Sequence, residues 1–370
     1  MKMWFTGSFA MLTVFMALVL ALACGGGSSA AVSNGRQQSD DDAADDDGSP
    51  ADDDDNDDDD SWSLMDSGTT TTDLRGVWGS SASDVFVVGN DMNTEAGAIL
   101  HYDGSSWSMM PSPATVQLYG VWGSSSSDVF VVGSTSVAGG ILHYDGAAWS
   151  AMSSGTSTAA LHDVWGSSSS DVLAVGQDQN TNAAVILDYD GTSWSTMASG
   201  TNDSLYLSGV WGISASDVFA VGRDETTSAA VILQYNGTSW SPMTIAAAAV
   251  IMSGVWGTSS SDVLAAGYGS TATEVLHYDG SSWSTMPGGD AGNGGLNRIW
   301  AASSTIAFAA GGDIANGGTP IAGVILRYDG SSWTEVMRSS TATWLFGIWG
   351  SAGSDVFCVG QGGAILHYGQ

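Results

Sequence analysis

The fold of this chain is decided by a stretch that begins at Gly76 and reads GVWGSSASDVFVVG as far as Gly89. After a variable loop the chain continues from Ala98 to Met109 as AILHYDGSSWSM. Both motifs return in the next unit and then to the end of the 370 residues. Self-similarity at a steady period indicates a repeat architecture, so the repeats must be counted first.

Two tryptophan columns count the repeats. The first follows Gly-Val or a variant, recurs every 43 to 49 residues, and comprises Trp78, Trp122, Trp165, Trp211, Trp256, Trp300 and Trp349. The second ends the Asp-Gly-x-x-Trp element and comprises Trp62, Trp107, Trp149, Trp194, Trp240, Trp283 and Trp333. Each column has seven members. A period near 44 residues is typical of propellers or of helical arrays.

The local pattern favours a propeller. Each unit holds four short runs rich in Val, Ile, Phe, Tyr and Trp, separated by Gly, Ser and Asp turns. The run from Val85 to Val88 is continuously apolar, as expected of a middle strand covered on both faces. Four strands per unit make a propeller blade. We therefore predict an all-β, seven-bladed β-propeller with four strands per blade.

The column offset predicts how the ring closes. The last unit, 346–370, stops at Leu366-His367-Tyr368-Gly369 and lacks a Trp-Ser-x-Met strand. Residues Ser61 to Met65 are that strand, alone at the start of the repeats. We expect a 3+1 closure in which the N-terminal strand completes the last blade and leaves no unpaired edge. The propeller domain would span residues 61–370.

Residues 1–23 have the pattern of a signal peptide, with Lys2 followed by an apolar core. The core ends in Ala21-Leu22-Ala23-Cys24-Gly25, which resembles the bacterial lipoprotein signal, although the usual leucine three places before the cysteine is Ala21. The resemblance implies that Cys24 carries a lipid and anchors an extracytoplasmic protein to a bacterial membrane, at the outer membrane or cell surface. An uncleaved anchor and a plain secretory signal are the alternatives.

The segment 24–60 is a predicted linker. It is rich in Gly and Ser and then in Asp, with fourteen aspartates between Asp40 and Asp60. Without large apolar residues it cannot form a core, and like charges extend it. We interpret it as a disordered spacer. Weak calcium binding is the alternative, because carboxylates suit hard cations, but no EF-hand loop is present.

The charge restricts the class of partner. The formal net charge is −32, and from Trp62 onward 25 acidic residues face five arginines. This balance excludes nucleic acid as the expected partner and favours neutral or cationic ones. Of the two cysteines, Cys358 lies where sister repeats carry Val or Ala. It is predicted to be a small buried residue and not a reactive thiol.

No catalytic, cofactor or metal site is predicted. The arginines Arg75, Arg223, Arg298, Arg327 and Arg338 lie on different blades at different repeat positions, and no polar constellation is seen to break the repeat. His101, His143, His277 and His367 share one repeat position, but positions of this kind on different blades are far apart. The tryptophan columns are interpreted as inter-blade packing, with a ring of sugar-stacking platforms as the alternative.

The segments Asp-Val-Phe-Val-Val-Gly and Ile-Leu-His-Tyr-Asp-Gly-x-x-Trp resemble BNR/Asp-box repeats and the repeats of photosystem-assembly-factor-like propellers. The turn from Asp103 to Trp107 is one residue shorter than an Asp-box. The Val-Trp-Gly element is similar, more weakly, to tectonin lectin repeats. These resemblances imply a protein-binding or assembly module, or a carbohydrate-binding lectin. A BNR-type glycoside hydrolase is disfavoured because no arginine cluster is evident.

The variable positions indicate where a ligand would bind. The loops joining strand two to three, and strand four to the next blade, lie on one face and differ between blades, whereas the Ser-rich and Asp-Gly turns hardly change. Rigidly held loops commonly carry binding, although neutral drift would look the same. The candidate residues for a protein or glycan partner are Asn90, Glu95, Asp178, Arg223, Asp224, Tyr268 and Asp313. We expect a monomer.

Overall fold

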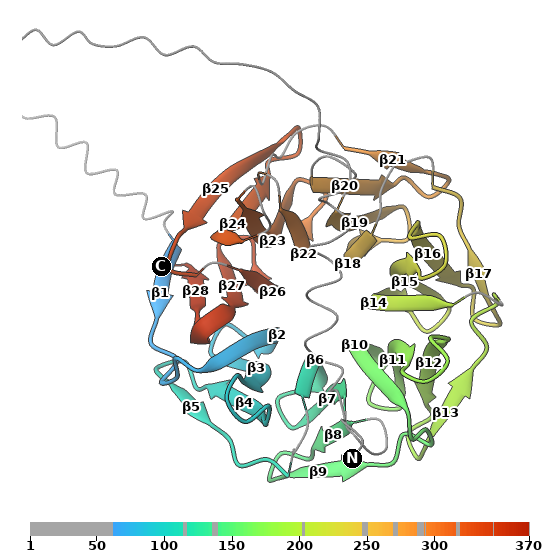
Figure 1. The fold of residues 1–370 in the computed structure, drawn as a ribbon, viewed down its shortest axis with the longest axis horizontal. Coiled ribbons are helices and arrows are strands. Elements are labelled where there is room, and N and C mark those ends of the chain that lie inside the picture. The colour runs from blue at the N-terminus through green and yellow to red at the C-terminus, as the bar shows by residue number, and fades with distance from the viewer. Residues whose placement is uncertain are drawn as a thin grey trace, which may run out of the picture. The chain divides into compact units, whose positions relative to one another are not determined.

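The computed structural model describes residues 62–113, 117–134, 140–201, 204–245, 251–268, 273–286, 292, 294–315, 319–342 and 344–369. The predicted signal peptide, Cys24 and the Asp-rich linker lie outside them. Among the described residues no helix is both long and apolar enough to cross a membrane. The described strands form an all-β propeller, as the repeats predict, with antiparallel groups of four arranged in a ring around a common centre (Figure 1).

The blades follow one another around the ring. The first three are β2 (Thr72–Ser81), β3 (Asp84–Asp91), β4 (Gly97–Tyr102), β5 (Trp107–Met109); β6 (Gln117–Ser125), β7 (Asp128–Ser134), β8 (Ile141–Tyr144), β9 (Trp149–Met152); and β10 (Ala159–Ser168), β11 (Asp171–Asp178), β12 (Ala184–Tyr189), β13 (Trp194–Met197). The next three are β14 (Leu205–Ser214), β15 (Asp217–Asp224), β16 (Ala230–Tyr235), β17 (Trp240–Pro242); β18 (Ile251–Ser259), β19 (Asp262–Tyr268), β20 (Thr273–Tyr278), β21 (Trp283–Thr285); and β22 (Gly295–Ser303), β23 (Ile306–Ile314), β24 (Pro320–Tyr328), β25 (Trp333–Ser339).

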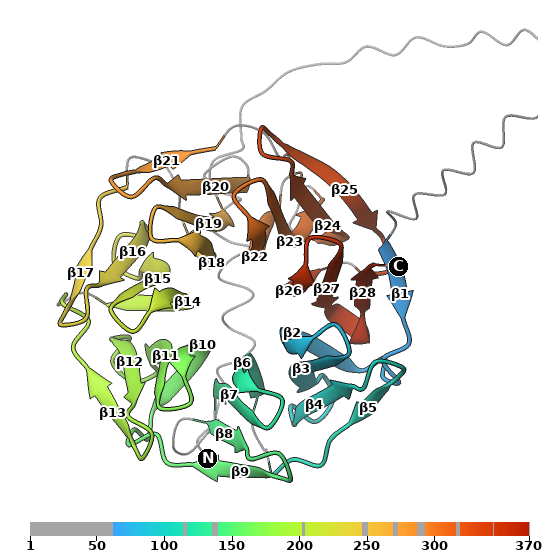
Figure 2. The same ribbon diagram turned by 180° about the vertical axis from the view of Figure 1, so that it is seen from behind.

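The final blade closes the ring. It contains β26 (Leu345–Ala352), β27 (Asp355–Gly360), the short 3-10 turn η1 (Gln361–Gly363) and β28 (Ile365–Tyr368), and its fourth strand is β1 (Trp62–Met65). β1 pairs antiparallel with β28, with Trp62 opposite Tyr368 and Met65 opposite Ile365. The expected 3+1 closure is therefore present in the structure, and both figures place β1 beside β28 (Figure 2).

The tryptophan columns pack between blades. In the first column, the indole of Trp78 faces the next blade so closely that a Cβ on Gly123 would lie 2.6 Å from its ring. In the second column, Trp149 meets Phe86 of the previous blade edge-on, with ring centroids 6.3 Å apart. Cys358 is fully buried in β27, which raises the pKa of its thiol and fits the predicted apolar role.

Candidate functional site

The predicted variable face is present, because the antiparallel order of strands in a blade places the loop between strands two and three beside the linker that enters strand one. The loop after β3 meets the start of β2, since the N–H of Met92 donates to the carbonyl of Thr71 at 2.7 Å. The loops after β11 and β15 make the same contact, from Gln179 to Thr158 and from Glu225 to Ser204. Loops between strands two and three therefore lie against the linkers that enter the inner strands.

Three of the candidate residues hold turns on this face. Asp178 accepts the N–H groups of Asn180 at 2.9 Å and Thr181 at 2.8 Å, and Asp224 binds its own turn in the same way. These hydrogen bonds, led by that of the Thr158 hydroxyl, lower the pKa of Asp178. Glu95 occupies the positive-φ position of the equivalent loop, at φ 58°. Each of these three residues therefore has a structural role in its own turn.

Asp313 is held by an ion pair and is nearly buried. The guanidinium of Arg338 donates to its carboxylate at 2.6 Å and, with its other nitrogens, to Glu335. These hydrogen bonds, with Glu335 contributing most, raise the pKa of Arg338. This contact ties β23 to β25 within one blade. Arg298 of β22 and Arg327 of β24 belong to the same blade as Arg338, so the expectation that the arginines lie on different blades is wrong for these three.

The remaining candidates, Asn90, Arg223 and Tyr268, lie at the end of the second strand of their blades. Asn90 is 8% exposed, and its Oδ1 has no hydrogen-bond partner in the described part of the chain. Arg223 pairs with Glu225 at 2.6 Å, and its guanidinium lies 5.3 Å from the centre of the Tyr206 ring. The hydroxyl of Tyr268 donates to Asn297 of the next blade at 3.0 Å. These side chains surround the inner strands.

The inner strands carry a feature that the sequence reasoning missed. Each has a β-bulge just before its Val-Trp-Gly element, and the extra residue in a bulge is re-aimed away from the regular pleat. The flanking residues hardly change, but the bulge residue differs between most blades: Arg75, Tyr119, His162, Ser208, Ser253, Asn297 and Phe346. We call this set of bulge residues the channel mouth, because the inner strands that carry them surround the centre of the ring (Figure 1).

One arc of the channel mouth is aromatic and cationic. The guanidinium of Arg75 lies 4.8 Å from the ring centre of Phe346 and 5.6 Å from that of Tyr119. The nearest carboxylate oxygen, on Asp73, is 3.8 Å away, and Arg75 makes no hydrogen bond to any described residue. His162 stacks on Tyr206 with centroids 4.3 Å apart. An arginine held by aromatic faces keeps its donors available for a partner.

The other arc is closed by hydrogen bonds between blades. Nδ1 of His162 donates to the carbonyl of Leu207 at 2.8 Å. The Ser208 hydroxyl donates to the carbonyl of Met252 at 2.7 Å, and Nδ2 of Asn297 to that of Leu345 at 2.6 Å. Burial lowers the pKa of His162 to about 4, so this imidazole is neutral at pH 7.

The position after the bulge is glycine in five blades, because neighbouring inner strands approach closely there. A Cβ on Gly254, for example, would lie 2.8 Å from the Cα of Arg298. The two exceptions are Asp163 and Arg298. Their side chains meet across the channel at 4.0 Å, Asp163 accepts the N–H of Val210 at 3.0 Å, and Arg298 donates to the carbonyl of Ser253 at 2.6 Å.

The charges of Asp163 and Arg298 suit the binding of a partner. Burial raises the pKa of Asp163, although the Arg298 charge and two backbone N–H groups act in the opposite direction. Arg75, Tyr119, Asp163 and Arg298 line a cavity of about 40 Å³, enough for ordered water but not for a substrate. No hydroxyl or thiol nucleophile among the described cavity residues lies beside a base. The described lining of this cavity presents charged and aromatic groups.

A recurrent Ser–Asp–His group lies on the opposite face. In the first blade, Asp84 accepts the hydroxyl of Ser80 at 2.5 Å and pairs with Nε2 of His101 at 2.6 Å. The same group recurs at His143 and His367, and at His277 a threonine, Thr258, supplies the hydroxyl. Hydroxyl and imidazole share one carboxylate, so the imidazole is not placed to activate the hydroxyl. Among the described residues, no group of three His, Cys, Asp or Glu could hold a metal ion.

The comparisons with known proteins identify the fold. No family model matches the chain, and no curated protein matches it. Similar solved structures include YCF48 bound to D1 peptide (TM-score 0.60, 13% identity, covering 84% of this chain and 97% of that one) and YCF48 from Cyanidioschyzon merolae (0.61, 14%, 83% and 98%). A catalytically inactive virginiamycin B lyase from Staphylococcus aureus with quinupristin is also similar (0.64, 12%, 83% and 98%). At these identities the likeness shows a β-propeller fold.

Proposed function

We propose that this chain is a binding propeller that recognises a polypeptide through the channel mouth and the surrounding variable loops. It acts outside the cytoplasm, attached to a bacterial membrane by a lipid on Cys24, and it is not an enzyme. The observation that carries the proposal is the placement of the departures from the repeat. Among these departures, Arg75, Tyr119, Asp163 and Arg298 converge on one cavity, and Arg75 also lies over the ring of Phe346.

Convergence at one end of the ring is what selection for binding produces. Drift would also change exposed loops, but it gives no reason for the two side chains that replace glycine, Asp163 and Arg298, to meet at 4.0 Å. Arginine and aromatic residues are the side chains that most often dominate protein interfaces. A similar structure described as YCF48 bound to D1 peptide gives further support, since a propeller of this shape accommodates a peptide.

Returning the channel to the repeat pattern is the sharpest test. The double variant Asp163→Gly and Arg298→Gly installs the residue that the five other blades carry, so the ring is expected to fold. Affinity capture with the mature protein, quantified by mass spectrometry, should recover its polypeptide partner at least about tenfold less well, a loss typical of a hot-spot pair. Unchanged recovery would contradict the proposed site.

The matched control removes one acid and one base from the opposite face. Asp145→Asn and Arg327→Gln again use residues that sister blades carry, Asn236 and Gln234. Partner recovery should stay at the wild-type level. A glycan array with the same proteins tests the lectin alternative, which saturable binding unaffected by the channel variant would favour.

The anchor needs its own measurement. If Cys24 is lipidated, mass spectrometry of the mature protein will show Cys24 as the N-terminal residue, carrying acyl chains. A Cys24→Ser variant should then leave the membrane fraction. An unmodified peptide that spans residues 21–27 in the mature protein would contradict the lipid anchor.

A further inference from the structure

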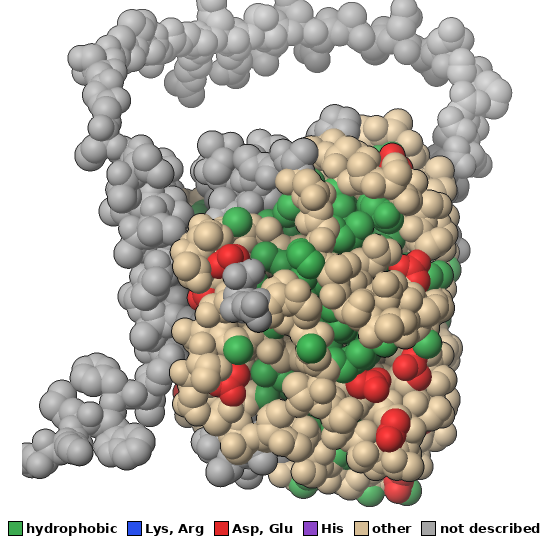
Figure 3. All heavy atoms as spheres, turned by 90° about the vertical axis from the view of Figure 1, so that its right-hand side faces the viewer, with side chains coloured by type: hydrophobic (Ala, Val, Ile, Leu, Met, Phe, Trp, Pro, Cys, Tyr) green, Lys and Arg blue, Asp and Glu red, His purple; other side chains and the backbone are tan. Residues whose placement is uncertain are grey.

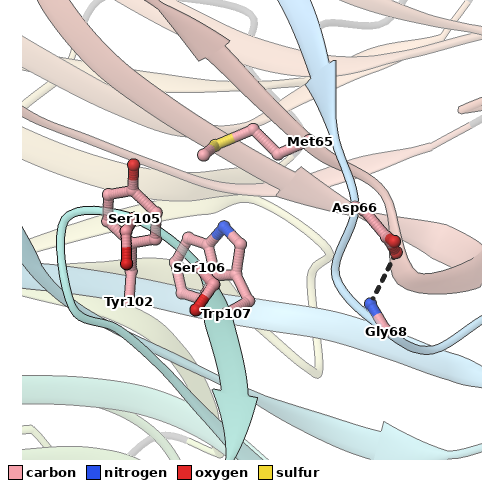
Figure 4. A pocket seen from close by; sticks show the side chains of 7 residues that line it. All are labelled: Met65, Asp66, Gly68, Tyr102, Ser105, Ser106 and Trp107. Atoms are coloured by element: carbon pink, nitrogen blue, oxygen red, sulfur yellow. Dashed lines mark hydrogen bonds between the residues drawn. The ribbon is translucent and has the colours of Figure 1, made fainter.

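A second concave site lies on the outer rim, where the ring closes. It is a pocket of about 330 Å³ lined by Met65 and Asp66 at the end of β1 and by Tyr102, Ser105, Ser106 and Trp107 of the first blade (Figure 4). The volume falls in the range of small-ligand sites. β1 and β5 follow one another along the rim, so the pocket lies across the closing seam (Figure 1).

The pocket exists because the linker stands away from the tryptophan at this seam. Three linkers share a Ser-Gly-Thr sequence with a positive-φ glycine. A Cβ added to Gly200 would lie 2.1 Å from the carbonyl oxygen of Trp240, and one added to Gly155 would lie 3.8 Å from that of Trp194. A Cβ added to Gly68 would have no such neighbour within 4 Å. Trp107 is accordingly half-buried, whereas Trp149, Trp194, Trp240, Trp283 and Trp333 are only 3–7% exposed.

The lining combines aromatic faces with a carboxylate. The rings of Tyr102 and Trp107 are tilted by 32° with centroids 5.1 Å apart, and Met65 lies over them (Figure 4). One oxygen of the exposed Asp66 accepts the N–H of Gly68 at 2.9 Å, and the other has no partner among the described residues. Aromatic faces are electron-rich, so both components attract a cation.

The charge around the pocket has the same sign. Asp103, in the turn that carries Ser105 and Ser106, accepts hydrogen bonds from both, and these lower its pKa to about 2. No arginine lines the pocket. Figure 3 shows the side of the ring away from the pocket; there too acidic side chains are scattered over the surface and no basic side chain of the described residues is in view. An acidic surface of this kind raises the local concentration of cationic ligands.

We propose that this rim pocket binds a cationic side chain, the ammonium of lysine or the guanidinium of arginine, presented by a polypeptide. The alkyl stem of such a side chain packs on Met65 and Trp107 while the charge meets Asp66. The site is separate from the channel mouth, and binding there does not depend on Asp163 or Arg298.

The test titrates the mature protein with Nα-acetyl-lysine amide and Nα-acetyl-arginine amide, following the Trp107 indole resonance by NMR. The neutral probe of matched shape is Nα-acetyl-norleucine amide, and glucose represents a sugar ligand. We expect saturable binding of both cations in the millimolar range, at least tenfold tighter than that of norleucine amide or glucose. Equal binding of norleucine amide, or tighter binding of glucose, would overturn the proposal.

The variant Asp66→Asn removes the negative charge of the pocket residue Asp66 without disturbing the fold. Asparagine can still accept the Gly68 N–H, so the turn is kept, and the affinity for both cations should fall three- to tenfold. Asp190→Asn is the control with the same charge change, in a turn where the fourth blade already has Asn236. It should alter affinity by less than twofold. Equal effects of the two variants would indicate a general surface charge and no built site.

Discussion

Deleting Trp62 to Met65 from the full chain should lower the free energy of unfolding of the propeller by on the order of 5 kcal/mol, which corresponds to a melting temperature about 10 °C lower. β1 is four residues long, yet it joins the two ends of the ring. Without it β28 becomes an open edge, and the chain that enters the first blade is no longer paired into the sheet of the last blade.

The size of the effect follows from what β1 contacts. The Trp62 ring packs 5.5 Å from that of Tyr368 and meets Phe308 of the sixth blade edge-on at 6.1 Å. Just beyond the strand, the Ser67 hydroxyl donates to the carbonyl of Gly363 at 2.7 Å, in a buried position. The deletion therefore removes the aromatic contacts of Trp62 together with the strand pairing, and it frees the chain that places Ser67 against Gly363.

Thermal and guanidinium unfolding, monitored by near-UV circular dichroism, measure the loss. Leu64→Ser is the control, because Leu64 is 64% exposed and its replacement should shift the midpoint little. A synthetic peptide of residues 61–69, added to the deletion variant, should restore part of the stability. A deletion variant that melts with the wild-type would mean that closure by β1 contributes nothing.

The fold was predictable because every blade repeats the same sequence pattern. Seven tryptophans in each of two columns predicted the strands, and the isolated Trp62 predicted the closure. The interpretation of Cys358 as a buried residue is likewise confirmed. In a repeat protein, equivalent segments of all blades show the same preference for strand or turn, so the pattern predicts the fold with little ambiguity.

The channel mouth was not predicted, and the reason is geometric. Asp163 and Arg298 are 135 residues apart, and only ring closure brings their side chains to 4.0 Å. A signal was present in the sequence, because Asp163 and Arg298 both replace glycine in the same column of the repeat. The rim pocket had no such signal. It depends on how far one linker leans from Trp107, and two other linkers share its Ser-Gly-Thr sequence.

Gly222→Ala should destabilise the propeller by about 4 kcal/mol or more, the size of loss that marks a backbone conflict. This glycine ends the apolar part of β15 opposite the bulge of β14. A Cβ there would lie 1.9 Å from the carbonyl oxygen of Tyr206 and 3.0 Å from the Cα of Leu207. The equivalent glycines of the other blades are equally constrained, with a backbone oxygen at 1.9–2.4 Å: Gly89, Gly133, Gly176, Gly267, Gly311 and Gly360.

Gly212→Ala in the same blade is the matched comparison. Its Cβ would also meet an atom closely, at 2.7 Å, but that atom belongs to the Trp165 ring, which can shift. The sixth blade already carries Ala301 at this position, where the Trp256 indole donates to the Ala301 carbonyl at 3.1 Å. We expect a loss of about 1–3 kcal/mol for Gly212→Ala, as for moderate overpacking. Equal losses for Gly222→Ala and Gly212→Ala in guanidinium unfolding would contradict the backbone conflict as the reason for glycine at position 222.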